Sequence, residues 1–136
     1  MDSNNQPNKN LNMSTLQIDQ AQRVDIICRR GDTFKMVLNV TSPTGAPVNV
    51  TPATSFNYKM EVRETDTATG TIIASGSFVF SGTASGVLTV TVSSTVMAAV
   101  DSGLYVYDLQ TTRVSDSLVQ TWIYGTFKIN EDVTVN

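Results

Sequence analysis

The sequence contains no histidine and only one cysteine among its 136 residues. The missing histidine removes the side chain that most often serves as a general base and as a metal ligand. A lone cysteine forms no intrachain disulfide, and no neighbouring residue offers Cys28 a base. Cys28 alternates with Val24 and Ile26 on one strand face, so we expect it to be a small buried hydrophobe. We therefore expect no enzymatic activity, no cofactor and no bound metal.

Charge is also scarce, since Lys, Arg, Asp and Glu make up 15% of the chain, with a net charge of -3. An acidic chain with scattered basic residues lacks the surface expected of a nucleic-acid binder. No apolar run approaches the ~20 residues that span a membrane, and the N-terminus lacks the apolar core of a signal peptide. We therefore expect neither nucleic acid nor membrane as a partner.

Thr, Ser, Val and Asn are abundant instead, and Thr and Val sit well on a pleated sheet. Short alternating stretches separated by turn residues predict an all-β fold, a seven-stranded antiparallel β-sandwich. The expected strands cover residues 23–29, 33–40, 56–64, 71–80, 87–92, 103–112 and 118–130. We expect a bulge at Gly76 and a short helical turn over residues 93–100, capped by a serine.

Residues 1–17 contain five asparagines and few apolar side chains. Such a segment cannot bury enough surface to offset the entropy of ordering, so we expect a flexible N-terminal arm followed by a domain over residues 18–136. Two interpretations stay open: an inert terminus, or an arm that orders on a neighbouring subunit. The candidate contact residues of the arm are Asn10, Leu11, Met13 and Leu16.

The tripeptide Arg30-Gly31-Asp32 allows an adhesion-receptor loop or a turn between strands. We interpret it as a turn, in which Arg30 ends one strand, Gly31 supplies an unusual backbone conformation and Asp32 hydrogen-bonds nearby amides. The less favoured alternative is an adhesion module that uses this tripeptide, which lacks the support of a secretion signal or a disulfide.

The heptapeptide "DSGLYVY" is similar to the Asp-x-Gly-x-Tyr-x-Cys pattern around the tyrosine corner of immunoglobulin-like domains. Asp101, Gly103 and Tyr105 occupy the matching positions, near the start of the penultimate strand. Tyr107 stands where the half-cystine would be. The resemblance implies an immunoglobulin-like sandwich whose core is held by packing alone.

The last expected strand predicts an exposed aromatic pair. Its inward set is expected to be Val119, Ile123, Phe127 and Ile129. That choice places Trp122 and Tyr124 on the opposite face, where aromatic residues are typical of an interface between proteins. The alternative is that a loop or the arm of the same chain covers them.

Four segments in order resemble a family of small β-sandwich modules in tailed-phage virions, such as the amino-terminal domain of baseplate upper proteins and related head and tail accessory proteins. They are "RRGDTFKMVLNV", "FNYKMEVRE", "DSGLYVYDLQ" and "GTFKINEDVT", and the resemblance covers residues 23–134. It implies a non-enzymatic virion component that binds other virion proteins, present in multiple copies or as a homo-oligomer.

A baseplate upper protein would continue into a much longer carboxy-terminal region. This sequence ends soon after the last expected strand, so we expect instead a capsid decoration or head-fibre-type protein that binds the major capsid protein. The alternative is a structural protein of the tail or baseplate. Either protein would fold in the host cytoplasm before it assembles into the virion.

Overall fold

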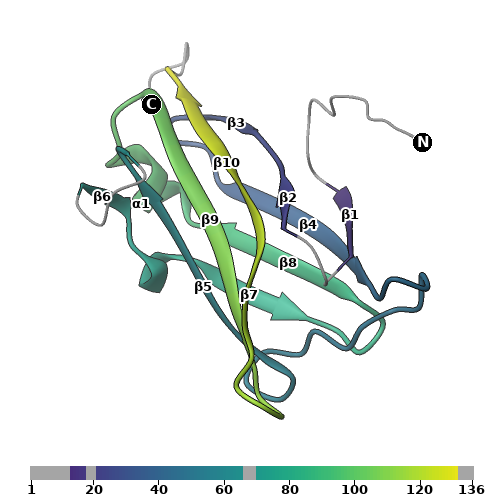
Figure 1. Ribbon diagram of the computed structural model, residues 1–136. Helices are drawn as coiled ribbons and strands as arrows, with labels where there is room; N and C mark the ends of the chain where they lie inside the picture. The colour runs from purple at the N-terminus through teal and green to yellow at the C-terminus, as the bar shows by residue number, and fades with distance from the viewer. Residues whose placement is uncertain (1–12, 18–20, 66–69, 132–136) are drawn as a thin grey trace.

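The computed structural model describes residues 13–17, 21–65 and 70–131. Within these residues the chain forms two β-sheets packed face to face, with one short α-helix and one 3-10 turn (Figure 1). Its elements are β1 (Met13–Gln17), β2 (Gln22–Arg23), β3 (Ile26–Arg29), β4 (Phe34–Thr41), β5 (Phe56–Arg63), β6 (Thr71–Ile73), η1 (Ser75–Ser77), β7 (Val79–Gly82), β8 (Val87–Val92), α1 (Ser94–Ala98), β9 (Gly103–Arg113) and β10 (Val119–Asn130). The expected all-β sandwich is confirmed, but the expectation of seven antiparallel strands is wrong, because the described residues form ten strands and β1, β2 and β3 pair in parallel with their neighbours.

The smaller sheet has the strand order β1-β4-β8-β7, and the larger has the order β2-β10-β9-β5-β6, with β3 also paired to β10. Apolar side chains fill the space between the two sheets, because every second side chain of a strand points inward. In β4 the buried side chains are Phe34, Met36, Leu38 and Val40. Each such residue contributes about 1.5–3 kcal/mol when it is fully buried. None of the helices in the described part of the chain is long and apolar enough to cross a membrane.

Two of the expected strands are each divided in the structure. The stretch 71–80 contains no bulge at Gly76; instead η1 carries the chain from β6 in the larger sheet to β7 in the smaller one. The stretch 23–29 is split into β2 and β3, which both run parallel to β10. Between them, the Asp25 carboxylate accepts a hydrogen bond from the Thr126 backbone N–H at 3.0 Å.

The expectation of a flexible arm is wrong for residues 13–17. They form β1, which pairs in parallel with β4 of the same chain and places Met13 beside Val37 and Leu16 beside Val40. The backbone groups at the edge of β4 provide hydrogen-bond partners, so this segment is ordered without a neighbouring subunit. Asn10 and Leu11 lie outside the described residues.

Candidate functional site

Trp122 lies inside the sandwich, so its expected exposure is wrong. Its side chain is 1% exposed, and its ring packs edge-on against Phe56 with 4.9 Å between ring centroids. The cause is a bulge: the register between β9 and β10 shifts between Thr121 and Ile123. An extra residue reverses the alternation on one side of a bulge. Trp122 and Ile123 therefore both point inward, and Val119, expected in the core, is 54% exposed.

Tyr124 lies beyond the bulge on the outer face of the larger sheet, where its side chain is 42% exposed. The strand register sets its neighbours, because Tyr124 is level with Arg23 of β2 and with Asp108 of β9. Asp108 is level in turn with Glu61 of β5. We call these four residues the first row; they run across the sheet from a cation on β2 to an anion on β5.

A second row lies beside the first on the same face. It consists of Asp25, Thr126, Val106 and Arg63, placed by the pairing of β10 with β9 and of β9 with β5 and by the Asp25–Thr126 hydrogen bond. That hydrogen bond, helped by the guanidinium of Arg23, lowers the pKa of Asp25. The second row therefore begins with an anion and ends with a cation, the reverse of the first row.

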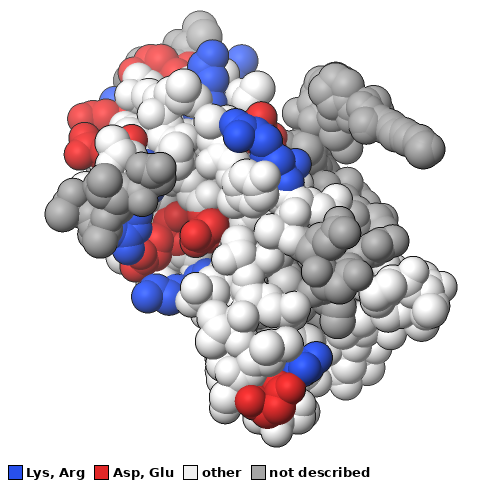
Figure 2. Space-filling view, in the orientation of Figure 1, with Lys and Arg blue, Asp and Glu red and all other residues white. Residues whose placement is uncertain are grey.

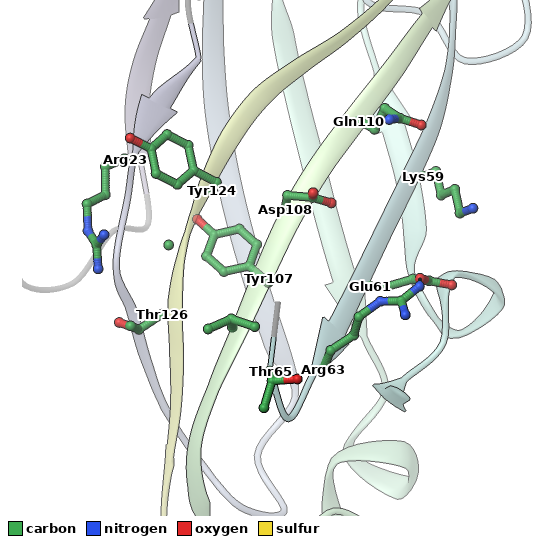
Figure 3. A pocket seen from close by; sticks show the side chains of 12 residues that line it. Arg23, Lys59, Glu61, Arg63, Thr65, Tyr107, Asp108, Gln110, Tyr124 and Thr126 are labelled. Atoms are coloured by element: carbon green, nitrogen blue, oxygen red, sulfur yellow. Dashed lines mark hydrogen bonds and ion pairs between the residues drawn. The ribbon is translucent and has the colours of Figure 1, made fainter. Parts of the chain in front are cut away.

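The two rows surround a depression with a volume of about 560 Å³. Its lining includes Arg23, Tyr124, Asp108, Glu61 and Arg63, whose side chains lie around it in Figure 3. Figure 2 shows acidic side chains gathered near the middle of this face with basic ones on both sides. The outer face of the larger sheet is thus a hollowed surface of mixed charge.

An ion pair links the two rows at each of their ends. The Arg23 guanidinium lies 3.2 Å from the Asp25 carboxylate, and Arg63 pairs with Glu61 on β5. Asp108 forms no ion pair with any residue that the structure describes. Burial raises the pKa of its carboxyl group, with a further rise from Glu61 against a lowering by Arg63. Glu61 lies directly opposite Asp108, and like charges in that position destabilise a sheet. Arg63 and Lys59 lower the pKa of Asp108 in turn, but neither forms a direct ion pair with it.

The tripeptide Arg30-Gly31-Asp32 forms a turn between β3 and β4, with Gly31 at a φ of +86°. The Arg30 guanidinium donates to the Ala98 carbonyl at 3.3 Å and lies 3.7 Å from the Asp101 carboxylate. These contacts tie Arg30 to the segment after α1. The tripeptide therefore lies against the domain rather than at the tip of a projecting loop.

The tyrosine corner is present. The Tyr105 hydroxyl donates to the Asp101 carbonyl at 2.8 Å, and a Cβ at Gly103 would lie only 3.1 Å from the Tyr105 ring, which favours glycine there. Tyr107, at the position of the half-cystine, is buried. Its hydroxyl donates to the Val24 carbonyl at 2.5 Å, so that a hydrogen bond joins β9 to the segment between β2 and β3.

Cys28 packs against the core as a partly buried side chain. Burial, with a smaller effect from Asp32, raises the pKa of its thiol to about 12, so the thiol stays protonated at neutral pH and is a poor nucleophile. No group of three or more His, Cys, Asp or Glu side chains within the described residues is arranged to hold a metal ion. The outer face of the larger sheet presents charged groups, hydrogen-bonding groups and the exposed ring of Tyr124.

Among the residues of this face, Tyr124 was predicted from the sequence as a contact residue. The other charged residues, namely Arg23, Asp25, Asp108 and the Glu61–Arg63 pair of β5, were not. One signal was available, since the outward alternation of Lys59, Glu61 and Arg63 is visible in the sequence. The sequence does not show which residue of β9 or β10 lies beside each of them.

No protein-family model and no curated protein matches the sequence. Among solved structures, the fold is similar to part of a family 123 glycoside hydrolase from Clostridium perfringens, with a TM-score of 0.51 and 10% identity over 84% of this chain. The match spans 24% of the length of the hydrolase. The NK cell receptor NKp44 matches with a TM-score of 0.41 and 16% identity over 82% of this chain and 99% of the receptor. At these identities the likeness to the hydrolase concerns the fold alone.

Proposed function

We propose that the protein is a non-enzymatic structural component of a tailed-phage virion, of the capsid auxiliary or head-fibre type. It binds other virion proteins through the outer face of the larger sheet. Two observations support this role. One is the order of the sequence segments that resemble phage modules, and the other is the mixture of charged, apolar and aromatic side chains on this face.

The outer face is the observation that carries the proposal. Beside the two charged rows, Ile27 of β3 and Leu104 of β9 are both level with Lys128 and largely exposed. Exposed apolar and aromatic side chains mixed with charges are characteristic of surfaces that contact other proteins. Many such contacts, repeated by the symmetry of a particle, give strong total binding even when each one is weak.

An add-back experiment tests this function. Particles of the phage that encodes the chain would be produced without it, purified and mixed with the purified protein. We expect the wild-type protein to sediment with the particles and Tyr124→Ala to be retained less. A matched control is Lys35→Glu, since Lys35 is an exposed residue of β4 on the other sheet. Absence of the wild-type protein from the particle fraction would refute the virion role.

A further inference from the structure

The two rows on the outer face carry their charges in opposite order. The first row has Arg23 at one end and Glu61 at the other, while the second has Asp25 at the first end and Arg63 at the other. The ends of a row are three strand spacings apart, about 14 Å. Charges at that distance do not pair with each other within one chain; each pairs instead with its neighbour in the other row, Arg23 with Asp25 and Glu61 with Arg63. The two ends of the face therefore carry the same pair of charges in opposite order.

We propose that this face binds the same face of a second copy of the chain, about a twofold axis that runs parallel to the strands between β9 and β10. Rotation about this axis exchanges the two ends of every row. Arg23 then meets Glu61 of the second copy, and Asp25 meets Arg63. Because a twofold interface is made of the same patch on both copies, every contact occurs twice. The inference rests on the proposed function, since the second copy of the chain would be one of the virion proteins that this face binds.

The same axis also pairs the two middle residues of the first row. Tyr124 of each copy meets Asp108 of the other, and a tyrosine hydroxyl donates a strong hydrogen bond to a carboxylate. Asp108 thereby gains a direct hydrogen-bond donor in addition to the nearby charges of Arg63 and Lys59. The depression that Asp108 lines has the room to receive an aromatic side chain.

Apolar contacts extend along the axis. Leu104, 65% exposed, would meet the aliphatic part of Lys128 from the second copy, since the two residues are level on β9 and β10 and long basic side chains cover apolar surface with their methylene groups. Val106 would meet Thr126 in the same way. Two sheets that pack face to face keep their strands within about 30° of each other, which an axis parallel to the strands allows.

A twofold axis perpendicular to the strands is the competing arrangement. Placed between the two rows, it would pair Arg23 with Asp25 and Glu61 with Arg63 of the second copy. It would, however, set Asp108 against Val106 and bury a carboxylate without a donor, which is costly. The axis parallel to the strands is therefore favoured, because it gives the Asp108 carboxylate a hydrogen-bond donor.

Exchange of charges between two variants tests the proposed pairing. Sedimentation equilibrium should show that the wild-type protein forms a dimer. Arg23→Glu and Glu61→Arg should each weaken self-association at least about tenfold, because each sets like charges against each other. An equal mixture of the two variants should restore a dimer that contains one chain of each kind. The perpendicular axis predicts no restoration, because the new carboxylate would still face Asp25 of the other copy and the new guanidinium would still face Arg63.

Three controls complete the test. Lys35→Glu, on the other sheet, should leave the dimer unchanged, and thermal melting should show that each charge variant is folded. Tyr124→Ala should weaken the dimer without changing the charge. A wild-type protein that stays monomeric, or a mixture that associates no better than its separate components, would overturn the inference. Sedimentation uses this chain alone, without phage particles, so a failure here is distinct from a failure of the add-back experiment.

Discussion

Replacement of Tyr107 by phenylalanine would remove one hydroxyl group from the core and leave the ring in place. The ring is buried and packs edge-on against Phe127 with 6.0 Å between centroids, and phenylalanine keeps that contact. What is lost is the hydrogen bond from the Tyr107 hydroxyl to the Val24 carbonyl. This bond holds the first segment of the larger sheet to β9 in a domain that has no intrachain disulfide.

The magnitude follows from the burial of this hydrogen bond. A typical intramolecular hydrogen bond contributes about 0.5–1.5 kcal/mol, and a buried group left without a partner costs about 1–3 kcal/mol. We therefore expect Tyr107→Phe to lower the free energy of unfolding by about 1–2 kcal/mol.

Urea denaturation followed by tryptophan fluorescence measures this change, since Trp122 is the one tryptophan of the sequence and lies in the core. The midpoint should fall while the dependence on urea stays constant. Tyr124→Phe is the control, because the Tyr124 side chain is exposed and its loss of a hydroxyl should change stability by less than about 0.5 kcal/mol. An equally small change for Tyr107→Phe would refute the assigned role of the hydrogen bond.

Three further predictions concern the core and its margins. Gly125→Ala should lower the free energy of unfolding by about 1–3 kcal/mol, because a Cβ at Gly125 would lie 2.6 Å from the Val24 carbonyl oxygen; an unchanged midpoint of urea denaturation would contradict this. Trp122→Phe should cost less than the ~3–5 kcal/mol expected for Trp122→Ala, since the indole N–H finds no hydrogen-bond partner among the described residues; equal losses in denaturation would contradict this. Stability should fall above about pH 10, where tyrosine ionises in the unfolded chain, because burial raises the pKa of Tyr58 and Tyr107 in the folded state. Below pH 10 both states bind these protons and stability is retained, so a denaturation midpoint that stays constant from about pH 9 to pH 11 would argue against it.

Local patterns in the sequence were sufficient to predict much of the fold. The alternation of β4 and β5 and the spacing around Tyr105 each depend on nearby residues, so they could be recognised without the structure. The helical turn was recognisable for the same reason, since the Ser93 side chain accepts a hydrogen bond from the Val96 N–H at 3.2 Å.

What could not be predicted depends on contacts between distant segments. Nothing near Trp122 in the sequence marks the bulge that turns it inward, because a bulge is defined by the register with β9. In the same way, the pairing of β1 with β4 depends on an exposed strand edge far along the chain, since Met13 is level with Val37. The two charged rows on the outer face come from β2, β5, β9, β10 and the segment between β2 and β3. Their alignment depends on the registers between these strands, which the sequence does not show.

The central proposal is that the protein is a structural part of a phage particle. Quantitative mass spectrometry of purified particles tests this claim most directly, by the ratio of this chain to the major capsid protein. The account predicts that the chain is present in a fixed ratio that matches a multiple of the capsid symmetry. Purified, infectious particles that contain none of the chain would contradict it.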